Sequence, residues 1–492
     1  MEERNRITQY MVAAAVSLAS MTLGVTSAWP TPVLAKFHAH ETDVVINDNE
    51  IAWMVAITSP GFIAGSFVTG YLSDHHGRRT TILSSAAPML VGTILLLCST
   101  NMWVLYTARF LWGCGTGMIG TVVSMYLAEI ADKDLRGTLN GGTRFMFNLG
   151  TLLAISVGPF LSYRVLNICI LVMPVVYFLA CWWIPESPYY YLKEGRVEEA
   201  KRVLSRLRNY NDRRELEEEL SLLKTSVADD MRRGSSVKEL FSGKQYRKAL
   251  IIATGLKLTQ IMSGVVTVQQ YLGRIMQDTN SNVSLPTIFI IFGAVRFVIG
   301  IISSVLADRV GRRPLVVYSY LATAVCHAMC GAYFFCQEVL KVDQKDLTAY
   351  GYVPFIGILG SSIISTLGFA SIIFVIVGEI FPMNIKAVAL STMSIYGGVL
   401  GFIVGKGYQE LKNMTGLCGV FWIFAGIATL GAIFTLVYVP ETRGKSLRDI
   451  QILLQGDLYI EAGEKMEVVS TGLDKTQDTE LQDLNKKDNS TS

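Results

Sequence analysis

Long apolar runs occupy most of the chain, and short polar segments separate them. A helix needs about 20 mostly apolar residues to cross the hydrocarbon core of a bilayer, which is roughly 30 Å thick. The runs lack the period-two alternation of barrel strands, and backbone groups in lipid must bond within their own segment. We therefore predict an all-α membrane protein with twelve transmembrane helices, near residues 10–35, 51–73, 80–99, 102–128, 141–162, 165–184, 248–273, 286–306, 314–336, 352–381, 388–410 and 416–439.

One long polar segment, 185–247, divides these spans into two sets of six. Within it, Val197, Ala200 and Leu204 recur at helical spacing among Glu and Arg, which predicts short amphipathic helices. We therefore expect a polar N-terminus, a six-helix bundle, a helical linker, a second six-helix bundle and a polar tail. Their expected bounds are 1–9, 10–184, 185–247, 248–439 and 440–492.

The distribution of basic residues indicates which side of the membrane each loop occupies. Loops after the even-numbered spans are rich in Lys and Arg, whereas the opposite loops, such as "STNM" and "QDTNSNVS", contain few. The positive-inside rule then places the linker and both termini in the cytoplasm. Two N-x-S/T sequons, at Asn282 and Asn413, fall on the expected outer side and are candidate glycosylation sites.

Composition supports a bilayer environment and narrows the functional classes. The chain is 51% hydrophobic and 17% charged, which is unusual for a soluble protein, and its net charge of +3 gives no reason to expect a nucleic-acid partner. The eight cysteines lie in or beside apolar runs, so we expect neither a disulfide framework nor a metal site. The sequence has no Walker A loop, G-x-S-x-G elbow or H-E-x-x-H helix, so we expect a protein that is not an enzyme and needs no cofactor.

A charged motif occurs twice, as "LSDHHGRRT" at 72–80 and "LADRVGRRP" at 306–314. Glu129 in "EIADKDLRG" and Glu379 in "EIFPMNIKA" form a second pair of landmarks. This doubling predicts two six-helix repeats that rock around a site near the membrane midplane. A carboxylate beside guanidinium groups can hold helix ends together in one conformation and release them in another. The alternative, that the arginines only follow the positive-inside rule, does not account for the acidic members or the repeated spacing.

These motifs resemble those of the sugar porters of the major facilitator superfamily. The matching stretches are "GYLSDHHGRRT", "ARFLWGCGTG", "YLAEIADKDLRGTL", "PESPYYYL", "TQIMSGV", "LADRVGRRP", "GEIFP" and "PETRGKSL". Trp29 and Pro32 also resemble the W-x-x-P of the insect trehalose branch. The resemblance implies a facilitative carrier of a hexose or trehalose in the plasma membrane, whose partners are that sugar and the lipid bilayer. It gives no indication of the oligomeric state.

The resemblance also implies a network of cytoplasmic gate residues. His75 stands where the family usually has a basic residue, which predicts a weaker or pH-sensitive contact in the first half. The gate residues implied are Asp74, Arg78, Arg79, Arg109, Glu129, Arg136, Glu186, Asp308, Arg309, Arg312, Arg313, Glu379, Lys386 and Glu441.

The expected sugar site departs from the family pattern. A sugar site normally presents amides and aromatic faces, and the family motif Q-Q-L-S-G-I-N of the seventh span reads "QIMSGVV" here, so a glutamine and an asparagine become apolar. In the fifth span the family glutamine aligns with Arg144, and in the tenth the tryptophan aligns with Phe374. The candidate substrate-binding residues are Trp29, Arg144, Gln260, Gln270, Tyr271, Arg296 and Phe374.

Arg144 and Arg296 are expected inside the membrane, where a charge is costly and should face a wet cavity or a partner. One hypothesis is that they make the cavity positive and favour an anionic solute; the alternative is that they bond backbone carbonyls or reach toward the headgroups. The first span contains no acidic residue, which favours downhill uniport over proton coupling. Three functions are considered. We favour a facilitator for a hexose or trehalose; the alternatives are a carrier of another small solute, with an anion as one candidate, and a non-transporting solute sensor.

Overall fold

The computed structural model describes residues 7–454 apart from 40–41, 43, 45, 133–134, 209–212, 233–236, 280–282, 344–346, 348, 382–384, 444–449 and 451–453. The expected N-terminal segment 1–9 is therefore described only from Ile7, and most of the expected tail 440–492, together with Asn282, lies outside the described residues. Within the described part the secondary structure is helical and contains no strand.

The first bundle contains six membrane spans, some of which are built from two helices. The helices are α1 (Ile7–Ala28), α2 (Pro30–His38), α3 (Asp48–Ala56), α4 (Thr58–His75), α5 (Arg78–Ser84), α6 (Ala86–Leu97), α7 (Met102–Ile130), α8 (Arg136–Val157) and α9 (Tyr163–Cys181). Three spans consist of two helices each: α1 with α2, α3 with α4, and α5 with α6. Short breaks of this kind are tolerated in bundles because neighbouring helices satisfy the freed backbone groups.

The linker and the second bundle follow in the same way. The linker contains α10 (Pro188–Lys193), α11 (Val197–Arg208), α12 (Arg213–Arg232) and α13 (Val237–Ser242). The second bundle contains α14 (Arg247–Met262), α15 (Val265–Gln270), α16 (Leu272–Gln277), α17 (Leu285–Val310), α18 (Arg312–Glu338), α20 (Val353–Leu367), α21 (Phe369–Ile380) and α22 (Lys386–Tyr438).

The prediction of twelve spans is confirmed, although two of them need explanation. Ten described segments are long and apolar enough to cross a membrane, and α8 is not among them because it carries Asn140, Arg144 and Asn148. The last segment holds two spans within α22, which changes direction at Gly416, where φ is +72°. The carboxylate of Glu338, at the end of α18, accepts hydrogen bonds from the backbone N–H groups of Leu417 and Cys418 just after this break, at 3.0 and 3.2 Å.

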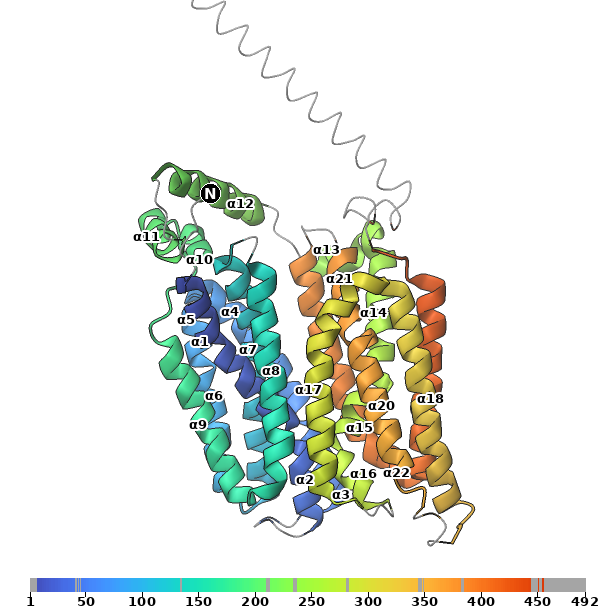
Figure 1. Cartoon of the computed structure of the whole chain (residues 1–492). Helices are drawn as coiled ribbons and strands as arrows, with labels where there is room; N and C mark the ends of the chain where they lie inside the picture. Colours follow the sequence, from blue (N-terminus) through green and yellow to red (C-terminus); the bar gives the residue numbers. More distant parts are fainter. Residues whose placement is uncertain are drawn as a thin grey trace, which may run out of the picture.

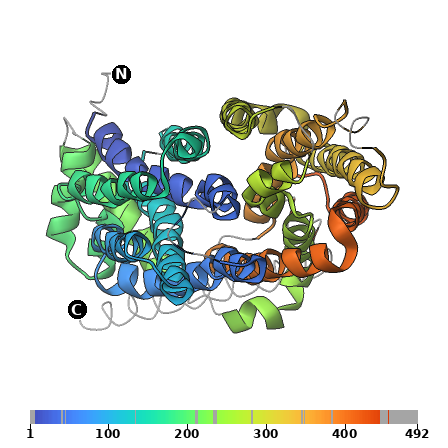
Figure 2. The same ribbon diagram turned by 90° about the horizontal axis from the view of Figure 1, so that it is seen from below.

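The two bundles lie side by side, as the two perpendicular views show (Figures 1 and 2). We call the face on which α10–α13 lie the linker face, and the opposite face, near α2, α3 and α16, the distal face (Figure 1). Gln9 at the start of α1 connects the first bundle to the linker, because its Nε2 donates to Leu207 O at 3.3 Å and to Asp132 Oδ2 at 3.1 Å. The linker therefore packs on one end of the first bundle.

Glycines allow helices of the first bundle to approach closely. A Cβ atom at Gly65 of α4 would lie 2.0 Å from Cys114 O of α7, and one at Gly24 of α1 would lie 2.0 Å from Phe147 O of α8. Small residues at such crossings let backbones touch, which is the usual basis of helix association in membranes. In contrast, a Cβ at Gly70, five residues after Gly65, would meet nothing within 4 Å.

Gly65→Ala should therefore destabilise the protein by about 1–3 kcal/mol, because the added methyl group forces α4 and α7 apart. Gly70→Ala adds the same methyl group to an open position on the same helix and should be neutral or slightly stabilising. Thermal stability in detergent, followed by size-exclusion chromatography after heating, measures both. Equal stability of the two variants would contradict the close crossing.

Candidate functional site

A cavity of about 410 Å³ lies between the bundles and is lined by residues of both. This volume falls in the range of about 300–1,000 Å³ that is typical of small-molecule sites. The first bundle contributes side chains from α1, α3, α4, α7 and α8, and the second contributes from α14, α15, α17 and α22. A solute in this cavity would therefore touch both bundles at once.

Hydroxyl and amide groups supply most of the neutral polar lining. The first bundle provides Thr58 and Ser59, and the second provides Thr267, Gln269 and Gln270. The Oγ1 atom of Thr58 is buried without a hydrogen-bond partner. Groups that both donate and accept suit a solute with several hydroxyls.

The side chain of Arg109 also lines this cavity and is only 2% exposed. Its guanidinium lies 5.1 Å from the ring centroid of Trp29 and 5.7 Å from that of Trp112. Nε is 3.4 Å from Met54 O, and Nη1 has no hydrogen-bond partner. Cation–π contact with the two indoles stabilises the buried charge in part.

This position corrects the expectation that Arg109 belongs to the cytoplasmic gate network. Arg109 lies in the first third of α7, which begins at the distal face, whereas Glu129 lies at the other end of the same helix. Twenty helical residues separate them, which corresponds to about 30 Å. The motif "ARFLWGCGTG" identifies the helix, but the direction of the helix decides which face its arginine approaches.

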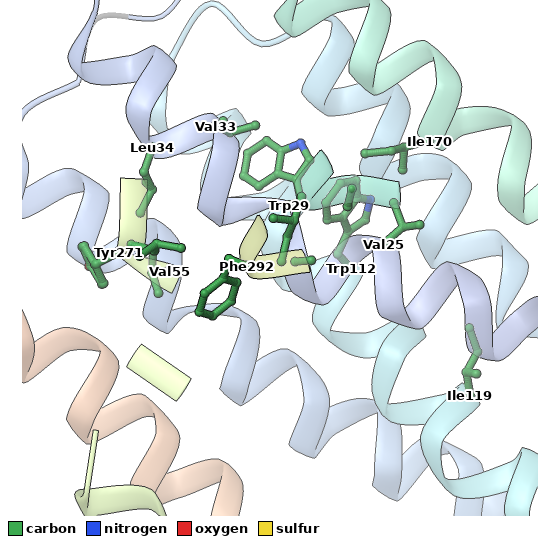
Figure 3. Packing of buried hydrophobic residues seen from close by; sticks show 14 of the residues in the cluster. Val25, Trp29, Val33, Leu34, Val55, Trp112, Ile119, Ile170, Tyr271 and Phe292 are labelled. Atoms are coloured by element: carbon green, nitrogen blue, oxygen red, sulfur yellow. The ribbon is translucent and has the colours of Figure 1, made fainter. Parts of the chain in front are cut away.

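Among the predicted substrate-binding residues, Gln270 and Arg296 line the cavity. Trp29 is fully buried in the apolar cluster drawn in Figure 3, where it meets Trp112 edge to face at 5.5 Å. Its Nε1 donates to Asn167 Oδ1 at 2.9 Å. It therefore supports Arg109 from outside the cavity wall.

The other predicted substrate-binding residues do not line this cavity. Tyr271 is fully buried against Tyr408, with ring centroids 4.3 Å apart. The Nε2 atom of Gln260 donates to Ala370 O at 3.2 Å. Arg144 is exposed, and Phe374 is 64% exposed on α21.

Several cavity residues were not predicted. They include Thr58, Ser59 and Thr267, whose residue types are common in spans and give no signal by themselves, and Gln269, whose amide beside Gln270 was an available signal. Gly397, Gly401 and Gly405 line the cavity from α22 at a spacing of four residues. This spacing places the three glycines on one helix face. The four-residue repeat of glycine was therefore the sequence signal that could have identified them.

The first bundle carries a compact charge cluster on the linker face. Nε of Arg78 lies 3.1 Å from both carboxylate oxygens of Glu129, and Nη1 donates to Ser73 O at 2.8 Å. The carboxylate of Glu186 accepts the backbone N–H groups of Arg78 and Arg79 at 2.7 and 3.0 Å. These two residues begin α5 after Gly77, whose φ is +92°, so Glu186 compensates the positive end of that helix.

The second bundle repeats this arrangement. The carboxylate of Glu441 accepts the backbone N–H groups of Arg312 and Arg313 at 3.1 and 3.0 Å, at the start of α18. The preceding Gly311 has a φ of +103°, and Arg312 Nη2 lies 3.4 Å from Glu379 Oε1. Burial acts to raise the pKa of Glu441, but hydrogen bonds from the backbone N–H groups that surround it prevail and lower it.

The remaining gate residues take different positions. Asp74 pairs with Lys193 of α10 at 2.9 Å, and His75 stacks on Tyr71. Lys386 begins α22 and approaches Gly378 of α21. The structure does not describe the side chains of Arg136, Asp308 and Arg309. Of the two sequon positions, only Asn413 is described, and it is exposed.

Polar contacts join the two bundles near the distal face. Nη1 of Arg274 in α16 lies 2.6 Å from Oδ1 of Asp48 in α3. The hydroxyl of Thr31 donates to Gln269 O at 3.1 Å, and Lys406 Nζ donates to Asn49 Oδ1. The charge clusters on the linker face, in contrast, each lie within a single bundle. The structure therefore holds the bundles together between the cavity and the distal face.

Comparison with known proteins identifies the family. The profile of the family described as "Sugar (and other) transporter" matches residues 16–454. The chain belongs to this family of transporters. A relative named facilitated trehalose transporter Tret1, from Bombyx mori, is 33% identical over 452 residues, which cover 91% of this chain and 87% of the relative.

Other relatives are longer than this chain. The facilitated trehalose transporter Tret1 of Drosophila pseudoobscura pseudoobscura is 32% identical over 455 residues, and the match covers 91% of this chain but 51% of the relative. The chain thus spans about half the length of such relatives.

Solved structures establish the fold. The inward-open xylose transporter XylE from E. coli superposes with a TM-score of 0.74 at 19% identity, covering 90% of this chain and 99% of that one. The proton:xylose symporter XylE bound to 6-bromo-6-deoxy-D-glucose gives 0.71 at 20% identity, covering 92% and 100%. The expected twelve-helix fold of the major facilitator superfamily is confirmed, and the chain is a multi-pass membrane protein.

The position of Glu441 leads to a pH-dependent prediction. Glu441→Ala should lower thermal stability at pH 7 by about 1 kcal/mol, because the first N–H groups of α18 lose their carboxylate acceptor. The pKa of Glu441 is lowered by folding, so its contribution is present above the unfolded value of about 4.3 and is lost as the pH falls through the folded value. Unfolding curves should therefore show that Glu441→Ala loses less stability, relative to the unaltered protein, at pH 3 than at pH 7.

Glu410→Ala is the matched control, because this carboxylate pairs only across one helical turn with Lys406 and is largely exposed. It should change stability by a few tenths of a kcal/mol at most. A difference for Glu441→Ala that grows at pH 3 would contradict the assignment.

Proposed function

We propose that this protein is a facilitative transporter that moves a small sugar, a hexose or trehalose, across the plasma membrane by alternating-access uniport. The observation that carries this proposal is the hydroxyl- and amide-lined cavity of about 410 Å³ shared by the two bundles. The relatives named as facilitated trehalose transporters support trehalose as a candidate.

The absence of acids from the cavity supports uniport. No Asp or Glu is among the described residues that line it. Coupling to protons requires a group inside the membrane that gains and loses a proton during the cycle. A carrier without such a group moves its solute only down the gradient of that solute. For this, the solute only has to bind in both the inward-facing and the outward-facing conformation.

The orientation we propose places the linker face in the cytoplasm. This face carries Arg78, Arg79, Arg312 and Arg313, as the positive-inside rule requires. Asn413 then lies outside, where glycosylation takes place, and the sequon at Asn282 is proposed to lie on the same side. Both termini are cytoplasmic in this orientation.

Alternating access requires contacts that close each face in turn. We assign the closed distal face to the Asp48–Arg274 pair and the contacts beside it. On the linker face, Glu129 and Glu379 are bound by arginines of their own bundles and become available to the other bundle when the arrangement changes. Arg136, Asp308, Arg309 and Lys386 remain proposed members of this cytoplasmic gate.

Counterflow tests the proposed function directly. In proteoliposomes preloaded with unlabelled sugar, labelled trehalose or D-glucose should accumulate transiently, and a proton uncoupler should not change the rate. Collapse of uptake in the presence of the uncoupler would contradict uniport. Saturable sugar binding without any exchange would instead identify a sensor.

The distal contact gives a second test. Asp48→Asn should shift the equilibrium away from the distally closed state by about 1 kcal/mol, or about fivefold, and change the exchange rate accordingly. The exchanged pair Asp48→Arg with Arg274→Asp should restore the rate. Lys201→Gln is the control, because its partner Glu217 lies at 3.1 Å within the linker, away from the distal face. An equal effect of Lys201→Gln would show that the distal pair has no special role.

A further inference from the structure

Three cationic side chains surround the cavity. Arg109 reaches it from the first bundle and Arg296 from the second. Lys257 of α14 lies beside the cavity wall, because a Cβ atom on Gly397 would be 2.7 Å from its Cε and 3.6 Å from its Nζ. The cavity thus receives positive charge from both bundles.

None of these cations has a carboxylate partner in the described part of the chain. The ion pairs found there do not include Arg109, Lys257 or Arg296. The lining residues that the structure describes include no acid. Glu129 of α7 and Glu379 of α21 are bound at the linker face by arginines.

Neutral contacts compensate these charges only in part. Arg109 has two indole faces and one long contact to Met54 O, but its Nη1 atom is buried without a partner. A buried guanidinium with an unmet donor costs free energy, which a bound anion would recover through charge-assisted hydrogen bonds. Thr58, whose buried hydroxyl also lacks a partner, lines the same cavity.

The cavity keeps two amides, Gln269 and Gln270, but lacks two others that the family motif would place there. Ile261 and Val266 line it at the two positions where the sequence motif loses its glutamine and asparagine. Loss of neutral hydrogen-bonding groups together with unpaired cations is the pattern expected of a site for an anion.

We propose that the transported solute is a sugar derivative that carries an anionic group, a carboxylate or a phosphate, bound between Arg109 and Arg296. This inference rests on the proposed function and narrows its substrate class from neutral to acidic sugars. Because the two arginines belong to different bundles, the anion also screens their mutual repulsion and favours closure of the bundles around it.

Exchange assays on the full chain in proteoliposomes test this proposal. The probes are labelled D-glucuronate, D-glucose 6-phosphate, D-glucose and trehalose, with lactate as an acid that has no sugar ring. At least one acidic sugar should half-saturate exchange at a concentration at least tenfold below that of glucose. Its uptake should also respond to a potassium diffusion potential, because each cycle moves net charge, whereas glucose uptake should not.

Substitutions at Arg296 locate the effect. Arg296→Gln should reduce the preference for the acidic sugar at least tenfold, and Arg296→Lys should retain most of it. Arg144→Gln is the matched control, because Arg144 is an arginine of a neighbouring span that is exposed and does not line the cavity. It should leave the preference unchanged.

The outcomes separate this inference from the proposed function. Exchange of neutral sugars that exceeds that of the acids, and is unaffected by Arg296→Gln, would overturn the inference and leave sugar transport intact. Exchange of lactate without any sugar derivative would support the charge preference and overturn the sugar assignment. If Arg296→Gln fails to fold, competition of D-glucuronate against labelled D-glucose on the unaltered protein decides, and a weaker effect than that of unlabelled D-glucose would overturn the inference.

Discussion

A charge that leaves water for the membrane interior must find a partner or a wet space, and this constraint explains the positions of the ionisable groups. Carboxylates such as Glu129, Glu379 and Glu441 lie at helix ends, where guanidinium groups or backbone N–H groups bind them. Arg109, Lys257 and Arg296 instead gather around one cavity. The same requirement thus determines both where the charge clusters lie at the helix ends and the chemical character of the cavity.

The two bundles meet this requirement with the same local structure. In each, a glycine with positive φ ends one helix, two arginines begin the next, and a distant glutamate accepts their backbone N–H groups. Glycine is required at Gly77 and Gly311 because other residues rarely adopt that backbone conformation. Repetition of this structure in two halves explains why the motif recurs in the sequence with its acidic members retained.

Most of the fold could be predicted because span length and hydrophobicity are properties of the sequence alone. The direction in which individual side chains point could not be predicted, because it depends on the rotation and direction of each helix. Arg109 belongs to a recognisable motif, yet only the direction of α7 shows that it lies far from Glu129. Phe374 matches an aromatic position in the family pattern but faces outward from α21. Thr58 and Ser59 were missed because Ser and Thr are common throughout the spans and only contact with the cavity distinguishes them.

The break at Gly416 has a mechanical consequence. The last two spans are joined there without a loop, and Glu338 of α18 fastens the joint by two backbone hydrogen bonds. Lys406, on the first of these spans, contacts Asn49 of the other bundle. A displacement at that contact is therefore transmitted through the hydrogen-bonded corner at Gly416 to α18, at whose far end lies the Arg312 cluster. The two sides of the membrane are thus mechanically coupled along α18.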